Sequence, residues 1–405
     1  MSDLEVNVAT RRGNHLAPFG FAGAVAVATL ALILAFSFLR GGREVEPAAS
    51  ASPSASAAAV ASASPGASGS AAPSPSGAGS ARPDAQHGFI ARGDFGGGSE
   101  GFMRTESDAA VLTQFSRPIL VATTRDGLRV ASIRQTPTGP QLVTFDTATP
   151  TAQKTLVDFA RNGESVGDVV WGSDLANELL LEVYRLGPAV GTETPVTYAS
   201  LRAVDAGTGA VREITRVNNG MRLRPLIWRG AASTAAALEW SPAGGFASAY
   251  EYIRAGTVTR SPFELQVIAT SVRADPDGQR VLAIGGLPAP RGVTWWPIDR
   301  FDARRRLEAD PAFDVSIALW RSGTDEIVVF ASPLTKAATA QRIEAWTTGD
   351  KRRTVAEGAA PLGVLRVDGT AALTTGGTLV DLRTGVVTDI PGWDRNQVPY
   401  LAVKF

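Results

Sequence analysis

The sequence predicts an all-β fold, a six-bladed β-propeller preceded by one transmembrane helix and a disordered linker. From about Val111 onward, short apolar runs alternate with Gly, Asp and Ser turns, without a long amphipathic helix. The same turn-and-strand unit recurs at a regular spacing along this region. Near the N-terminus, an apolar run is followed by a stretch of Ala, Ser, Pro and Gly, which predicts the helix and the linker.

The repeated unit is clearest where the polar turn Asp275-Pro276-Asp277-Gly278 opens into an apolar strand. Apolar runs on both sides of a tight turn are typical of adjacent antiparallel strands. Six copies follow one another about 46 residues apart, with one longer interval of about 57, the period expected of four-stranded blades. The copies lie at residues 119–133, 168–184, 226–240, 274–284, 317–330 and 363–373.

A propeller closes its ring by combining strands from both ends of the chain in one blade. Residues 109–115 and 400–405 are strand-like segments outside the six copies, so we assign them to closure. The count is six blades, and it becomes seven if these segments complete another blade. Residues 87–101 contain Gly96-Gly97-Gly98 and are expected to be irregular.

The N-terminal part predicts a membrane anchor. Residues 16–39 carry no charge and are long enough, at about 1.5 Å per residue, to cross a hydrocarbon core of about 30 Å. Residues 47–81 are Ala, Ser, Pro and Gly apart from Val60, so they cannot bury a core. The predicted domains are a cytoplasmic tail (1–15), a transmembrane helix (16–39), a linker (40–86) and an extracytoplasmic propeller (87–405), which makes a single-pass protein of the cell membrane.

A second turn motif recurs in step with the first, at Val204-Asp-Ala-Gly-Thr-Gly209 and Asp381-Leu-Arg-Thr-Gly385. With these two motifs the chain resembles the TolB-like and WD40-like bacterial propellers over roughly residues 118–390. Their blades carry a Trp-Ser-Pro-Asp-Gly turn and a later Asp-x-x-Thr-Gly turn. The resemblance implies the fold and says little of function, because these residues shape turns. The chain departs from the pattern in that the first, fourth and sixth copies lack the Trp.

Composition excludes several classes of function. Lys plus Arg and Asp plus Glu number 39 each, so no net charge favours a nucleic acid. There is no Cys, and the only His residues are His15 and His87, which removes Ser-His-Asp triads and His- or Cys-based metal sites from the repeats. No phosphate-binding loop appears either, so we expect neither a cofactor nor a metal.

Carboxylate chemistry stays open as an alternative. Asp168, Asp275 and Asp314 lie near the ends of first strands, where propellers expose side chains to the central channel. Two converging carboxylates would suffice for a glycosidase-like hydrolase. Nothing in their spacing pairs them, and each can equally serve as a turn cap or as the partner of a nearby Arg.

Binding is the favoured function, so we expect the chain not to be an enzyme. The connections at residues 185–197 and 285–297 join second and third strands and emerge on one face, where loops of a rigid scaffold commonly bind ligands. Arg185, Arg291, Trp295 and Trp296 are the candidate binding residues. Adjacent Trp residues point to opposite sides of a strand, so one of the two is expected to be exposed for a sugar ring or a protein. The expected partners are an envelope protein or a surface glycan, besides the membrane contacted by residues 16–39.

Overall fold

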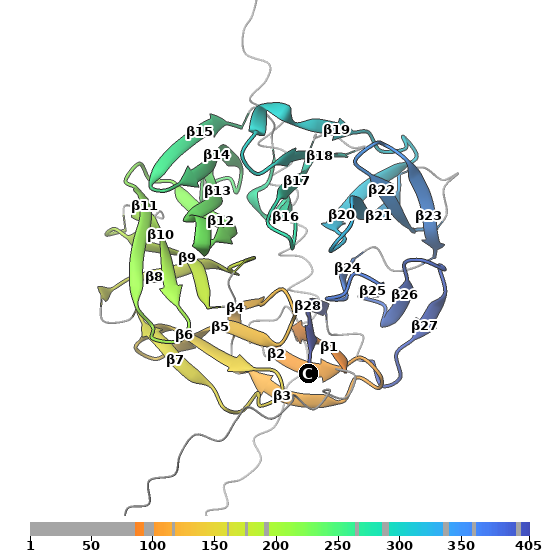
Figure 1. The fold of residues 1–405 in the computed structure, drawn as a ribbon, viewed down its shortest axis with the longest axis horizontal. Coiled ribbons are helices and arrows are strands. Elements are labelled where there is room, and N and C mark those ends of the chain that lie inside the picture. The colour runs from red at the N-terminus through yellow and green to blue at the C-terminus, as the bar shows by residue number, and fades with distance from the viewer. Residues whose placement is uncertain are drawn as a thin grey trace, which may run out of the picture. The chain divides into compact units, whose positions relative to one another are not determined.

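The computed structural model describes residues 86–92, 101–115, 118–159, 162–174, 177–189, 194–263, 267–285, 291–334, 340–358, 362–393 and 398–405. These residues all belong to one compact unit, Ala78–Phe405. They form seven four-stranded antiparallel sheets arranged around a central axis, a β-propeller (Figure 1).

Each blade runs from an inner strand at the axis to an outer strand at the rim. The closing blade combines β28 (Val398–Lys404), β1 (His87–Arg92), β2 (Gly101–Thr105) and β3 (Val111–Phe115). The second blade contains β4 (Pro118–Thr123), β5 (Arg129–Thr136), β6 (Gly139–Asp146) and β7 (Lys154–Asp158). The third contains β8 (Ser165–Trp171), β9 (Glu178–Leu186), β10 (Val196–Asp205) and β11 (Val211–Val217). The fourth contains β12 (Arg222–Arg229), β13 (Thr234–Trp240), β14 (Ala247–Arg254) and β15 (Thr257–Pro262).

The remaining three blades follow in chain order. The fifth contains β16 (Val272–Ala274), β17 (Arg280–Gly285), β18 (Gly292–Pro297) and β19 (Arg305–Leu307). The sixth contains β20 (Phe313–Trp320), β21 (Glu326–Pro333), β22 (Arg342–Thr347) and β23 (Arg352–Glu357). The seventh contains β24 (Gly363–Leu365), β25 (Ala371–Thr374), β26 (Thr378–Asp381) and β27 (Val387–Asp389). Short 3-10 turns lie at η2 (Gly230–Ala232), η3 (Ala269–Ser271) and η4 (Phe301–Ala303).

The core lies between neighbouring blades rather than at the axis. Second strands are buried on both faces, as in β13, where every residue except Trp240 is buried. The largest cluster joins blades β12–β15 and β16–β19, and within it Trp296 packs edge to face on Tyr250 at 5.5 Å and on Phe301 at 5.1 Å. Burial on both faces explains why these strands read as continuous apolar runs in the sequence.

The predicted count of six blades is wrong, because the chain has seven. The strands that were missed are β1 and β2, in the Gly-rich stretch that was expected to be irregular. β1 pairs with both β2 and β28, and Phe89, Ile90, Ala91 and Met103 are buried. These strands are short and separated by glycines, so their period-2 pattern spans too few residues to be distinguished from a loop.

The predicted membrane topology is also corrected. Where the structure describes the chain, it contains no helix with the length and apolar surface needed to cross a bilayer. The expected tail (1–15), helix (16–39) and linker (40–86) lie outside the described residues, apart from Gln86 at the linker's end. The single-pass localisation and the extracytoplasmic placement of the propeller are therefore not retained.

Candidate binding site at the axial mouth

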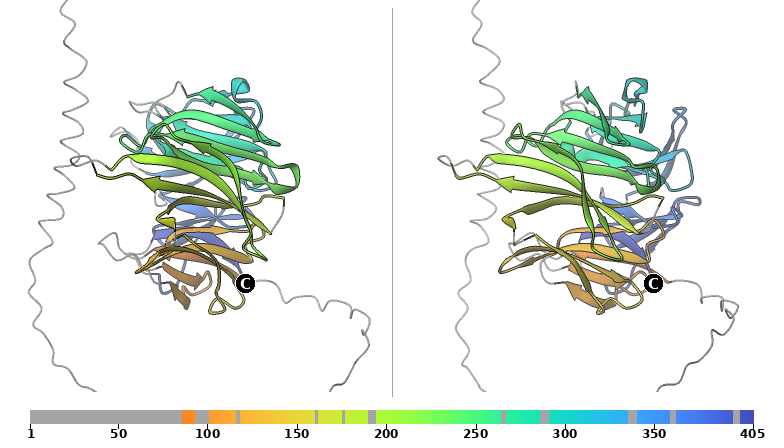
Figure 2. Two further views of the ribbon diagram at one scale, coloured as in Figure 1. Left: turned by 90° about the vertical axis from the view of Figure 1, so that its left-hand side faces the viewer. Right: turned by 60° about the vertical axis from the view of Figure 1, so that its left-hand side comes forward.

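The turns that join inner strands to second strands gather at one end of the axis. In three of them an Asp side chain caps the turn: Asp126 accepts a hydrogen bond from the Leu128 N–H at 3.1 Å, and Asp275 and Asp368 cap their turns in the same way. Each of these turns contains a glycine with a positive φ, as at Gly127 (+73°) and Gly278 (+67°). The recurring Asp and Gly are thus demanded by turn geometry. The C-terminus lies at the same face of the ring in the side views (Figure 2).

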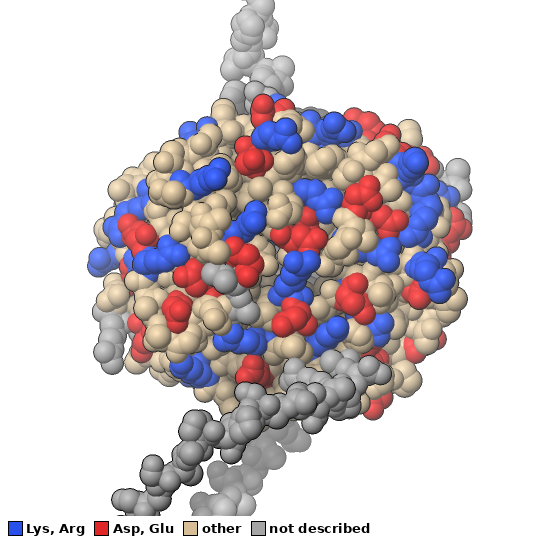
Figure 3. All heavy atoms as spheres, in the orientation of Figure 1, with Lys and Arg blue, Asp and Glu red and all other residues tan. Residues whose placement is uncertain are grey.

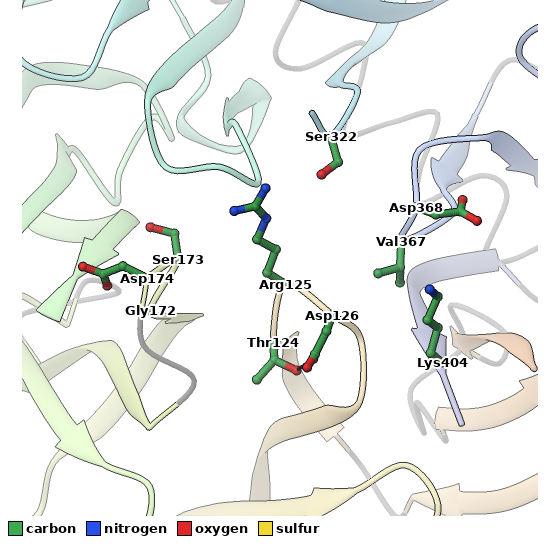
Figure 4. A pocket seen from close by; sticks show the side chains of 10 residues that line it. All are labelled: Thr124, Arg125, Asp126, Gly172, Ser173, Asp174, Ser322, Val367, Asp368 and Lys404. Carbon is green, nitrogen blue, oxygen red and sulfur yellow. Dashed lines mark hydrogen bonds between the residues drawn. The ribbon is translucent and has the colours of Figure 1, made fainter. Parts of the chain in front are cut away.

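These turns enclose a pocket at the axial mouth. Its volume is about 380 Å³, at the small end of the range for small-molecule sites. Five blades contribute to it, so its shape depends on closure of the whole ring. The lining residues are Thr124, Arg125, Asp126, Gly172, Ser173, Asp174, Ser322, Val367, Asp368 and Lys404 (Figure 4).

Arg125 stands near the middle of the pocket, on the turn between β4 and β5 (Figure 4). Its guanidinium pairs with Asp277, on the β16–β17 turn across the mouth. Asp277 also accepts a hydrogen bond from the Gly323 N–H at 3.2 Å. Because the Arg125 side chain remains 52% exposed, this ion pair is worth little in stability and can rearrange around a ligand.

Lys404 brings the second cation to the pocket, at the end of β28. Its backbone N–H donates to the Gly127 carbonyl at 2.9 Å, which fixes the position of the residue in the ring. Within the described part of the chain, its ammonium group has no hydrogen-bond or ion-pair partner. Burial, and then the positive charges of Arg366 and Lys404, lower the pKa of the neighbouring His87 against the opposing effect of Asp368.

The acidic residues of the pocket act partly as structural caps. Asp174 accepts a hydrogen bond from the Gly230 N–H at 3.0 Å, and Asp368 Oδ2 lies 3.4 Å from His87 Nε2. Burial would raise the pKa of Asp368, but hydrogen bonds from Thr370 and the charges of His87 and Arg366 outweigh it and lower that pKa. The carboxylate is therefore ionised at neutral pH. Among the described residues, no group of three or more His, Cys, Asp or Glu could hold a metal ion.

The three predicted channel carboxylates are each engaged by an arginine. Asp168 pairs with Arg224 at 2.7 Å, Asp275 with Arg280 at 2.7 Å and Asp314 with Arg291 at 2.6 Å. The Asp275 side chain is fully buried. The three residues belong to three different blades, and within the described ranges no hydrogen bond or ion pair joins any two of them. Each of the three carboxylates thus has a nearby arginine as its partner, which was one of the two structural roles considered for it. A catalytic role remains a prediction.

The predicted loop-face residues lie at the end of the strands opposite the mouth or in the core. Trp296 is fully buried among Tyr250, Phe263 and Phe301. Trp295 is half-buried and packs edge to face on Trp320 at 6.0 Å. Arg185 is exposed at the end of β9, and Arg291 is held by Asp314. The structure does not bring these residues together, and their binding role stays a prediction.

The pocket residues Arg125, Ser173, Ser322 and Lys404 were not predicted from the sequence. Their only signal is position: Arg125, Ser173 and Ser322 each follow an inner strand by two residues, and Lys404 is the last residue of the inner strand β28. That signal requires every inner strand to be assigned, including β28, which is recognisable only once the closing blade is known.

No family model matches the chain, and no curated protein matches it in sequence. Among solved structures, an oligogalacturonate lyase in complex with manganese is similar at a TM-score of 0.52 with 16% identity, covering 78% of this chain and 86% of that one. A second oligogalacturonate lyase, from Vibrio parahaemolyticus, has a TM-score of 0.49 and 13% identity, covering 75% of this chain and 87% of that one. TolB from Acinetobacter baumannii has a TM-score of 0.41 and 14% identity, covering 67% of this chain and 63% of that one. At these identities the likeness concerns the β-propeller fold alone.

Proposed function

We propose that this chain is a binding module whose axial mouth holds a small, hydroxyl-rich ligand, a glycan. One observation carries the proposal: the pocket of about 380 Å³ is lined by both hydrogen-bond donors and hydrogen-bond acceptors. The Lys404 ammonium and the Ser322 hydroxyl are donors, whereas the carboxylates of Asp126 and Asp174 are acceptors. Sugar hydroxyls both donate and accept, so a lining of both kinds suits them.

The charge of this face supports a neutral polar ligand over a polyanion. Acidic and basic side chains are interspersed over the face that carries the mouth, without a broad patch of one sign (Figure 3). Such a surface gives no long-range attraction to a uniformly charged polymer. Recognition would therefore rest on hydrogen bonds made within the pocket.

The alternative, a carboxylate-dependent hydrolase in the central channel, has weaker support. A general acid or nucleophile needs a carboxyl group that is free to change its protonation or to attack. Asp168, Asp275 and Asp314 are each held by a guanidinium at 2.6 to 2.7 Å. Their ion pairs favour a structural use of all three.

A thermal-shift screen of the full chain against neutral and acidic glycans tests the proposal. A ligand at a hundred times its Kd adds about 2.7 kcal/mol, enough to raise Tm by several degrees. We expect Lys404→Met to abolish the shift. Lys351→Met, on an exposed turn outside the pocket, should retain it. A shift that survives Lys404→Met, or a partner that proves to be a protein bound elsewhere, would overturn the proposal.

A further inference from the structure

The central channel contains a second group of polar residues, three of them charged, separate from the pocket. Asp168 lies on β8, Arg224 on β12, Arg273 on β16 and Tyr400 on β28, all within inner strands (Figure 1). None of the four lines the mouth pocket.

Arg273 lies at the axis. Its neighbours Val272 and Ala274 pack into the core between blades β12–β15 and β16–β19, so the alternation of the strand turns Arg273 away from that core. Side chains from three other blades influence its pKa, namely Arg224, Tyr400 and Asp168. Side chains of four blades can act on one group only where the inner strands converge.

Two guanidinium groups meet at one backbone oxygen in this channel. The Val272 carbonyl accepts hydrogen bonds from Arg224 Nη1 at 3.1 Å and from Arg273 Nη1 at 3.3 Å. Arg224 also pairs with Asp168 at 2.7 Å, which balances its charge. Arg273 additionally donates to the Thr270 carbonyl, and none of its contacts in the described part of the chain is with a carboxylate.

The group therefore carries one cation more than it has anions. Burial, followed by the charge of Arg224, lowers the pKa of Arg273 to about 10. Arg273 is half-buried, and a cation that is partly withdrawn from water beside a like charge is costly unless an anion pairs with it. The unsatisfied charge is positive and its donors form a planar fork, which matches an oxyanion with two coplanar oxygens.

We propose that the channel binds a small carboxylate beside Arg273 and Arg224, at a site distinct from the mouth pocket. The carboxylate would supply the counter-charge that the chain itself does not provide at Arg273. This inference does not depend on the proposed glycan site, because no residue is shared between the two.

Thermal unfolding of the full chain with sodium acetate, measured against sodium chloride of equal ionic strength, tests the site. We expect acetate to raise Tm in a saturable manner in the wild type and in Arg185→Met, which removes an exposed arginine outside the channel. Arg273→Met should lose the acetate response and, without acetate, should melt no lower than the wild type, because the repulsion between Arg273 and Arg224 is removed. Lys404→Met should respond like the wild type.

A second variant keeps the test decisive if Arg273→Met does not fold. Arg273→Lys retains the charge and loses the planar fork, so the half-saturating acetate concentration should rise about tenfold. An equal acetate response in the wild type and the Arg273 variants would overturn the proposal, as would the absence of any response beyond sodium chloride. A response to sodium phosphate without one to acetate would overturn the assignment to carboxylates.

Discussion

Glu251 is the residue whose ionisation opposes folding most clearly. It lies on β14 with 2% of its surface exposed, and its Oε2 has no hydrogen-bond partner within the described residues. The nearby Glu239 takes both hydrogen bonds of Arg260, at 2.9 and 3.0 Å. Burial and then the charge of Glu239 raise the pKa of Glu251 to about 7, despite Arg260. The folded state therefore favours the protonated form of Glu251.

This predicts a loss of stability at high pH. The folded pKa lies above the unfolded value of 4.5, so the stabilisation is complete below that value and is lost as pH rises through about 7. The difference corresponds to about 3 kcal/mol. Urea unfolding at pH 5 and pH 8 should show the decline in the wild type and in Glu357→Gln, an exposed control. Glu251→Gln should show a smaller decline, since the pKa values of Glu106 and Glu182 are also raised; the same decline in that variant would show that Glu251 is not responsible.

At the same scale, the sequence placed the two Trp residues on opposite sides of their strand but could not say what covers each. The structure buries Trp296 in one blade interface and rests Trp295 against Trp320 of the next. Which face of a strand meets a neighbouring blade depends on packing across the ring. The sequence pattern of one strand therefore does not predict it.

At the scale of elements, turns were the most predictable part. The motif at residues 381–385 closes as the sequence suggests, with Asp381 Oδ1 accepting from the Thr384 N–H at 2.6 Å and from its hydroxyl at 2.8 Å. Those hydrogen bonds lower the pKa of Asp381. Asp205 repeats the arrangement with Thr208. Such chemistry is local, so the sequence contains it in full.

The glycine of that motif has two roles that a pair of variants can separate. Gly385 has a φ of +75°, and a Cβ there would lie 2.3 Å from the Val355 carbonyl oxygen. Gly358 has a similar φ of +78° with open space around it. We expect Gly358→Ala to cost about 1 to 2 kcal/mol for its backbone alone and Gly385→Ala about 3 kcal/mol or more, as measured by urea unfolding. Equal costs would contradict close packing of this turn against β23.

At the scale of the whole molecule, ring closure separates what the sequence could reveal from what it could not. The period of the repeat can be read from the sequence. β1 and β2, however, are short and lie on either side of Gly96-Gly97-Gly98, so the sequence does not identify them as strands. The sequence does not predict the pocket, because its residues come from five blades, with Arg125 and Lys404 near opposite ends of the described chain. Their convergence is a property of the closed ring, which also joins Arg366 to Glu106 across 260 positions.

Closure should be essential for folding. β28 supplies the inner strand of the closing blade and buries Val403 completely. Removing residues 398–405 should abolish cooperative thermal unfolding followed by circular dichroism, because β1 loses its inner partner and the ring opens. Removing residues 1–77, which lie outside the compact unit, should change Tm by no more than about 2 °C. Cooperative melting of the chain without β28 would refute this role.

The most direct test of the central claim is a crystal structure of the full chain with a glycan that raises its Tm. We predict ligand density in the axial mouth, with sugar hydroxyls within hydrogen-bond distance of Lys404 Nζ and Ser322 Oγ. Ligand density at the opposite face, beside Arg185 or Arg291, with the mouth unoccupied would contradict it.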